Sequence, residues 1–321
     1  MLSRRFFLPL VLILIAVELG LAQNWGWGGG GRGRGRGRGR NGGGNVVWTE
    51  GNVPVDERTV KTAREIASHS TGTPVWTNNP GFERDVFTFC RLIRDRGEDS
   101  PYTAGDWITD FPDSDLNLSF RLQQMTAIRV HPDGRILRLT DPELASYPWI
   151  YTVEPGGLSF RDEEVSILRK YLLNGGVMMV DDFWGHWQWN YFEHQMARVF
   201  PDRQFREVEM SHPIFHCVFD LQGPISRLQT PGERTFERNG QDTSVTWEVH
   251  PQEDGNWEQC KDMHIRAIYD DKGRIMVIAA LNCDNGDGWE REGENEVFFR
   301  TFSEKRAFPL GINIIYYLMT H

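Results

Sequence analysis

The sequence predicts an α/β fold in which helices cover both faces of a mostly parallel sheet. The run 177–180 (Val-Met-Met-Val) is uniformly apolar, as in a strand that is buried on both faces. Before it come an apolar strand over 149–153 and a helix that ends at Asn174-Gly175-Gly176. A strand–helix–strand succession of this kind belongs to a parallel sheet.

The chain before this unit predicts three helices and one strand. Apolar residues at helical spacing predict helices over 56–69, 82–94 and 114–125. The segment 127–130 predicts a strand, which the turn Pro132-Asp133-Gly134 closes.

The chain after this unit predicts a C-terminal hairpin and a final helix. The strands 265–269 and 275–280 flank the turn Asp270-Asp271-Lys272-Gly273. The other predicted elements are a helix over 190–200, a strand over 214–221, an acidic glycine-rich loop over 282–296 and a helix over 310–319.

The charge of the chain is divided unevenly. Residues 1–45 hold seven arginines and one acid, so the net charge of −10 combines +6 on this segment with −16 on the remainder. An acidic body argues against a specific nucleic-acid partner, because neutralising phosphates requires a basic face. It suits a cationic ligand or a metal ion.

The first 22 residues are expected to be an export signal. A basic start at Arg4-Arg5 precedes an apolar segment over 6–17, and small residues before Gln23 suit cleavage after Ala22. The start also resembles a twin-arginine signal. We therefore expect a periplasmic or secreted bacterial protein whose mature chain has no transmembrane span.

Residues 23–45 are expected to be a disordered Gly/Arg-rich tether, because they cannot bury enough apolar surface to order themselves. The remainder, 46–321, is expected to be a single α/β domain. The four cysteines, Cys90, Cys217, Cys260 and Cys283, permit two disulfides in an exported chain, and free buried thiols are the alternative.

Candidate ligand-binding residues follow the 177–180 strand. They are Asp181, Asp182, Trp184 and His186, and we expect them to line one pocket at the carboxyl edge of the sheet, where ligands bind in such folds. The alternative is that one aspartate caps a helix and that the tryptophans fill the core. His212 is the fifth candidate, expected at the same edge.

Three of these candidates suggest a divalent cation. Carboxylate with imidazole, as in Asp182, His186 and His212, suits Mn, Zn or Fe. The segment 282–290 holds acids that suit calcium, but it lacks EF-hand spacing, and a solvated acidic loop is the alternative that we favour. Trp184, Trp187 and Trp189 suggest a glycan partner, since indole faces stack on sugar rings. Another protein of the cell envelope is an alternative partner.

Several motifs stand out along the chain. They are the segments 87–91, 107–110 (Trp-Ile-Thr-Asp), 147–151 (Tyr-Pro-Trp-Ile-Tyr), 163–172, 175–185, 212–216, 282–290 and 310–321. Together they resemble a known bacterial family, the domain-of-unknown-function 4159 family. The resemblance covers most of the chain from about Phe87.

The resemblance implies a three-layer domain of the flavodoxin and class I glutamine amidotransferase-like kind, and it implies no established activity. Amidotransfer needs a cysteine on a sharp strand-to-helix turn. Here that turn carries Asp181-Asp182-Phe183 and no cysteine. We therefore expect a non-catalytic ligand-binding or interaction domain. The alternative is a metal-dependent hydrolase, acting for example on glycans, that uses Asp182, His186 and His212.

Overall fold

A computed structural model describes residues 45–70, 72–81, 85–94, 107–232, 234–238, 241–246 and 257–321. The expected export signal and all but the last residue of the expected tether lie outside these ranges. The chain divides into a body, residues 34–234 with 245–321, and a small unit that includes 235–244. Among the residues placed by the structure, no helix is both long enough and apolar enough to cross a membrane.

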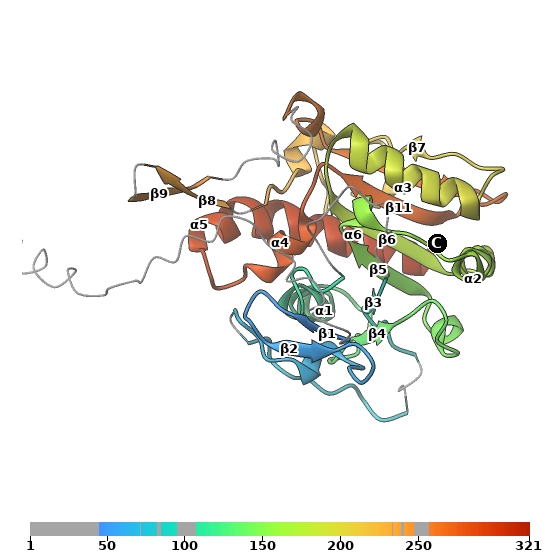
Figure 1. The fold of residues 1–321 in the computed structure, drawn as a ribbon, viewed down its shortest axis with the longest axis horizontal. Helices are drawn as coiled ribbons and strands as arrows, with labels where there is room; N and C mark the ends of the chain where they lie inside the picture. The colour runs from blue at the N-terminus through green and yellow to red at the C-terminus, as the bar shows by residue number, and fades with distance from the viewer. Residues whose placement is uncertain are drawn as a thin grey trace, which may run out of the picture. The chain divides into compact units, whose positions relative to one another are not determined.

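A seven-stranded sheet forms the centre of the body, in the order β4-β3-β5-β6-β11-β10-β7 (Figure 1). Its strands are β3 (Cys90–Leu92), β4 (Arg135–Leu137), β5 (Trp149–Val153), β6 (Val177–Phe183), β7 (Arg206–Glu207), β10 (His264–Tyr269) and β11 (Ile275–Leu281). The five strands from β4 to β11 are parallel, and β10 is antiparallel to both β11 and β7. This arrangement confirms the predicted mostly parallel sheet and the predicted C-terminal hairpin.

Strand β6 lies inside the sheet, between β5 and β11. All seven of its residues are buried. Val177 and Met179 pack into the core on one face, and Met178 and Val180 pack into the core on the other. The uniformly apolar run was therefore a correct signal for an interior strand.

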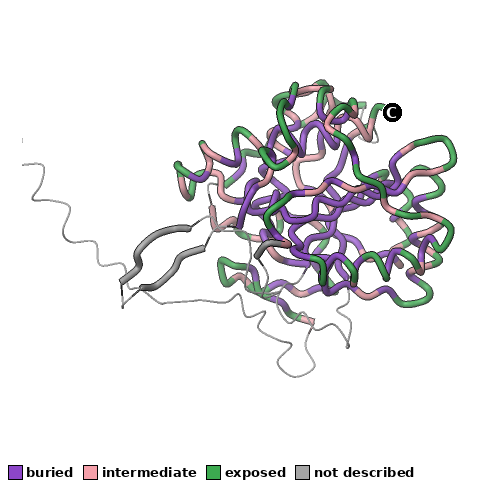
Figure 2. The backbone as a smooth tube through the Cα atoms, turned by 90° about the horizontal axis from the view of Figure 1, so that it is seen from above, coloured by how far each residue is buried: buried purple, intermediate pink, exposed green. Residues whose placement is uncertain are grey.

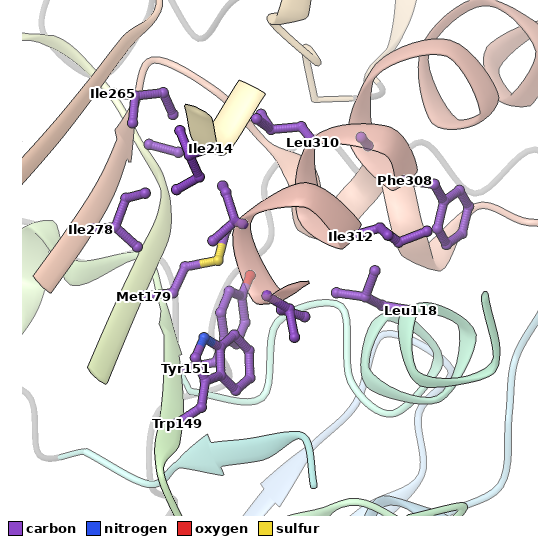
Figure 3. Close-up of a cluster of buried hydrophobic side chains, with 14 of the residues drawn as sticks. Leu118, Trp149, Tyr151, Met179, Ile214, Ile265, Ile278, Phe308, Leu310 and Ile312 are labelled. Atoms are coloured by element: carbon purple, nitrogen blue, oxygen red, sulfur yellow. The ribbon is translucent and has the colours of Figure 1, made fainter. Parts of the chain in front are cut away.

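Helices cover both faces of the sheet, which makes three layers. Helices α1 (Asp113–Met125) and α6 (Phe308–Thr320) contribute to one core, and α2 (Asp162–Leu173) and α3 (Gly185–Val199) contribute to the other. Figure 3 shows the first core, in which Leu118 and Ile312 come from the helices and Trp149 and Met179 from the sheet. Figure 2 shows buried strands surrounded by an exposed rim.

The remaining elements are short. They are β1 (Val46–Trp48), β2 (Pro54–Asp56), α4 (Asn285–Glu290), α5 (Glu296–Phe298), a π-helix (Phe299–Ala307) and the 3-10 turns Ala63–Glu65, Leu144–Ser146, Pro155–Gly157, Pro213–Phe215, Ile225–Leu228 and Trp257–Cys260. In a separate two-stranded sheet, β8 (Arg234–Arg238) pairs with β9 (Gln241–Thr246).

The prediction of a helix over 82–94 is wrong, because 90–92 form strand β3. Phe87 and Phe89 pack into one core, whereas Cys90 and Leu92 pack into the other. Alternation between two buried faces places an apolar residue at nearly every position, and such a run also satisfies a helical template.

Three other predicted elements are wrong. The segment 56–69 begins at the last residue of β2 and holds the 3-10 turn Ala63–Glu65 but no α-helix, and 127–130 makes one isolated bridge, Phe87 to Val130. The segment 214–221 begins in the 3-10 turn Pro213–Phe215 and forms no strand. Apart from that single bridge, neither of the two segments predicted as strands, both within the described ranges, pairs with a strand of the main sheet. The four cysteines, all in described parts of the chain, are free thiols.

Candidate functional site

The carboxyl edge of the parallel strands carries a group of residues in left-handed backbone conformations. Glu154 (φ 48°) follows β5, Asp182 (φ 54°) lies near the end of β6, and Asn282 (φ 59°) follows β11. Asp110 (φ 59°) lies in the loop before α1. Such conformations cost about 1–3 kcal/mol each, and they cluster where a protein holds side chains for a purpose.

Asp181 holds the start of α4. Its Oδ1 accepts a hydrogen bond from Asn285 Nδ2 at 3.1 Å, and its Oδ2 accepts from Gly286 N at 3.2 Å and from the Tyr151 hydroxyl at 3.4 Å. Burial raises the pKa of Asp181 to about 7, although these donors act in the opposite direction. Asp181 therefore binds the first turn of a helix distant in sequence, whereas the alternative interpretation had an aspartate capping the helix that follows β6.

Asp182 and Trp184 are buried together at the same edge. Asp182 Oδ1 accepts from Trp184 Nε1 at 2.9 Å. Burial, followed by the nearby Glu154 carboxylate, raises the pKa of Asp182 well above its usual range. His186, by contrast, is exposed on the first turn of α3. The structure brings three of the four neighbouring candidates into the edge and leaves His186 in solvent.

His212 lies at the opposite edge of the sheet, which corrects the prediction that it approaches the aspartates. Its ring centroid is 5.1 Å from that of Tyr317, near the end of α6. Tyr317 lines a cavity of about 560 Å³ with Gly175 and Ile275, which lie at the starts of β6 and β11. The chain between α3 and β10 returns to the amino ends of the strands, and no sequence signal distinguishes the two edges.

Of the three tryptophans expected to meet a glycan, two fill the interior. Trp184 and Trp189 are buried, and Trp189 packs against Phe183 and Phe192 in the core. Trp187 is exposed and stacks on Tyr191, with ring centroids 6.4 Å apart. The tryptophan cluster therefore offers one accessible indole face.

The segment expected to be a solvated acidic loop is instead buried. It forms the short helix α4, on which Asp284 (4% exposed), Asp287 (5%) and Glu290 (0%) lie three residues apart. Asp284 caps the helix, since its Oδ1 accepts from Asp287 N at 2.7 Å. Asp287 Oδ1 accepts from Arg291 Nη2 at 2.9 Å. The glycines and acids that suggested a loop instead form a helix whose residues are all buried.

The Asp110 carboxylate is buried at this edge without hydrogen bonds from the described residues to offset the cost of its burial. Its side chain is fully buried, and neither carboxylate oxygen has a hydrogen-bond partner among the described residues. Burial raises its pKa well above the usual range, and the charges of Glu290, Asp287 and Asp182 raise it further. A buried, unpaired carboxylate is costly, so its presence indicates a missing partner.

Asp110 is held in place from two sides. Arg91, itself fully buried, donates from Nη1 to the carbonyls of Trp107 and Thr109, both at 2.9 Å, and its Nε contacts the Asp115 carboxylate at 3.0 Å. On the other side lies Gly286, where a Cβ would stand 2.0 Å from Asp110 Oδ2. The loop before α1 is thus fixed against α4.

Three carboxylates at this edge have the spacing of cation ligands. Asp110, Asp284 and Asp287 each offer one oxygen, and these three oxygens lie within 4.8 Å of one another. Two oxygens bound to one Ca²⁺ at 2.3–2.6 Å are at most about 5 Å apart. Burial, then the charges of Asp182, Asp287 and Asp110, raises the pKa of Asp284 well above its usual range. A cation among these groups would remove that repulsion.

A second group of side chains lies beside the first. Glu50, His69 and Glu290 each offer one ligand atom, again within 4.8 Å of one another. His69 lies between two acids, with Nδ1 at 2.8 Å from Asp113 Oδ2 and Nε2 against Glu290. The pKa of His69 is raised to about 10: burial acts downward, but the bonds to Asp113 and Glu290 outweigh it.

Sequence reasoning named Asp181, Asp182 and Trp184 but missed Asp110 and His69 as site residues. Asp110 belongs to the motif Trp107-Ile108-Thr109-Asp110, which was noted only for its resemblance to the family. Glu50 and His69 both precede the first strand of the main sheet. His69 ends the segment 56–69, for which periodicity predicted an ordinary helix, and Glu50 lies before that segment.

The comparison with known families identifies the family of this chain. The family model described as a domain of unknown function, DUF4159, matches residues 99–319, more than half of the chain and all of the sheet from β4 onward. No curated protein matches the chain. The chain belongs to the DUF4159 family.

Proposed function

We propose that this protein is an exported, non-catalytic ligand-binding domain whose ligand is a divalent cation held by Asp110, Asp284 and Asp287. The observation that carries the proposal is the Asp110 carboxylate, which is fully buried with no hydrogen-bond partner on either oxygen among the described residues. Its oxygens lie near those of two further buried aspartates. Buried charges of one sign persist in proteins when they are paired or coordinate a metal.

The donor set favours Ca²⁺. All three ligands offer carboxylate oxygens, which hard cations prefer over nitrogen or sulfur donors. The aspartates are at most 5% exposed, so little room is left for the waters that Mg²⁺ retains. Arg291 forms an ion pair with Asp287. Burial and the neighbouring carboxylates raise the pKa of Asp110 and Asp284, and a bound cation would stabilise their ionised forms.

The burial of Asp110, Asp284 and Asp287 supports the non-catalytic assignment. Metal sites with a structural role are closed by protein ligands, whereas catalytic sites keep a position open to solvent. The alternative, a metal-dependent hydrolase, was expected to use Asp182, His186 and His212. These residues do not support it, because His186 is exposed and His212 lies at the other edge of the sheet. Export is proposed from the composition of residues 1–22 alone.

Calcium binding to the purified, EDTA-treated protein tests the proposal. We expect Ca²⁺ to bind and to raise the melting temperature, with a stabilisation of about 2.7 kcal/mol at a free concentration 100 times the Kd. Asp110→Asn should remove one equivalent of bound Ca²⁺. The matched control Asp271→Asn changes an exposed carboxylate and should bind as the wild type does. Absence of Ca²⁺, Mg²⁺ and Mn²⁺ binding, or unchanged stoichiometry in Asp110→Asn, would overturn it.

A further inference from the structure

The second group differs from the first in its donors and in its access to solvent. Glu50 follows β1, His69 lies in the segment before β3, and Glu290 ends α4, so three distant parts of the chain converge. The side chain of Glu50 is 43% exposed and that of His69 is 15% exposed. A path to solvent therefore reaches this group, whereas the three aspartates are closed.

His69 has the orientation of a metal-bound histidine. Asp113 Oδ2 contacts His69 Nδ1 and also accepts from the His69 backbone N–H at 3.0 Å, while Asp113 Oδ1 accepts from the Ser68 hydroxyl. These contacts fix the ring and direct Nε2 toward Glu290. In metal sites the other ring nitrogen of a histidine ligand typically faces a carboxylate, and here Asp113 Oδ2 lies 2.8 Å from His69 Nδ1.

Glu290 supplies a second, independent indication of a ligand. Its side chain is fully buried, and its Oε2 has no hydrogen bond within the described structure. The guanidinium of Arg291 lies 3.6 Å from Oε2. The same guanidinium lies 3.6 Å from Glu50 and 2.9 Å from Asp287. One arginine is thus shared by three carboxylates of the two groups.

We propose that His69 Nε2 and the carboxylates of Glu50 and Glu290 hold a second cation, of the class of Mn²⁺ or Zn²⁺. One imidazole with two carboxylates suits such ions better than it suits Ca²⁺. Asp113 is the positioning residue behind His69. The protein supplies three ligands, and the partly exposed Glu50 side chain connects the site to solvent. A further coordination position therefore stays available for water or an anionic ligand. This site does not depend on the cation at Asp110.

Pulsed electron paramagnetic resonance of Mn²⁺ added to the full-length protein tests this proposal. A ¹⁴N coupling to Mn²⁺ appears only when an imidazole nitrogen is a ligand. We expect this coupling in the wild type and in Asp110→Asn, and its loss in His69→Gln. The control His186→Gln removes an exposed histidine and should keep it. Absence of the coupling in the wild type, or its survival in His69→Gln, would show that His69 only forms ion pairs with Asp113 and Glu290.

A milder variant keeps the test decisive if His69→Gln fails to fold. Glu50→Gln alters a side chain that is 43% exposed, so the fold should tolerate it. We expect the nitrogen-coupled Mn²⁺ to bind at least tenfold more weakly in Glu50→Gln. Unchanged affinity would overturn the proposal. Loss of Ca²⁺ binding in Asp110→Asn with the nitrogen coupling retained would show that the two sites stand separately.

Discussion

Gly286 lies directly against the carboxylate of Asp110, so closely that a Cβ on this glycine would stand 2.0 Å from Asp110 Oδ2. The two residues are far apart in the chain, one in the loop before α1 and the other in the first turn of α4. Glycine is required here by the approach of a side chain, since Gly286 is not among the glycines of positive φ. The position of Asp110 therefore depends on the absence of a single methyl group.

Gly286→Ala should displace Asp110 and weaken Ca²⁺ binding by at least tenfold. The added methyl group also overpacks a buried contact, which typically costs 1–3 kcal/mol of unfolding free energy. Calorimetric titration with Ca²⁺ and chemical denaturation measure the two effects. Gly288→Ala is the matched control, because its Cβ would meet Ala307 at 2.3 Å and does not meet Asp110. Equal loss of affinity in both variants would indicate a general disturbance of α4.

Asp110→Asn should change stability in opposite directions with and without the cation. In EDTA the variant should be more stable than the wild type, because it removes a buried acid that must either take up a proton on folding or carry a charge beside other carboxylates. Asparagine tolerates the left-handed conformation at this position, so the backbone need not change. In saturating Ca²⁺ the order should reverse. Thermal melts of both proteins under both conditions check this, and a variant less stable than the wild type in EDTA would contradict it.

Arg91→Lys should destabilise the body by about 1–3 kcal/mol or more. Lysine cannot reproduce the fork that spans Asp115 and the carbonyls of Trp107 and Thr109, and it leaves buried acceptors without donors. Denaturant unfolding in EDTA measures the loss. Arg58→Lys is the control, since Arg58 is 66% exposed and pairs only on the surface with Asp56. It should change stability by less than about 0.5 kcal/mol.

Stability in EDTA should fall as the pH rises from about 4 to 7. Asp181 has a folded-state pKa raised to about 7, so the folded protein keeps a proton that the unfolded chain has already released. This group alone lowers the unfolding free energy by about 1.4 kcal/mol per pH unit within that window, and its effect levels off above it. Asp181→Asn resembles the protonated acid. Denaturation at several pH values should therefore give a shallower slope for this variant, and parallel curves would contradict the assignment.

The mature protein should begin at Gln23. The basic, apolar and small-residue order of 1–22 predicts export and cleavage after Ala22. Mass spectrometry of the intact protein from a bacterial host checks this. Recovery of the chain with Met1 from the cytosol would contradict it.

Hydrophobic pattern predicted the main elements well where it was unambiguous. The run 177–180 and the turn 270–273 each match one template, and both were placed correctly in β6 and the β10–β11 hairpin. The segment 82–94 matched the wrong template, because β3 is buried on both faces. Local pattern does not reveal which strands will cover a segment.

The site was only partly predictable for a related reason. Asp181 and Asp182 come after a clear apolar run, and they lie near the end of β6, at the carboxyl edge where the rule for such folds expects ligands. Asp110, Asp284 and His69 reach this edge from loops whose course depends on tertiary packing. Acids in a glycine-rich segment look solvated in sequence, and only the buried Trp289 and Gly288 beside them show that α4 is packed inside.

The two outer strands of the main sheet are β7, with two residues, and β4, with three. An outer strand presents unpaired backbone N–H and C=O groups, which invite pairing with another chain. Such short strands leave too few of these groups for a foreign strand to extend the main sheet. Resistance to strand-by-strand aggregation is thus built into the ends of this sheet, and a protein partner of the body would have to recognise side chains instead of the backbone.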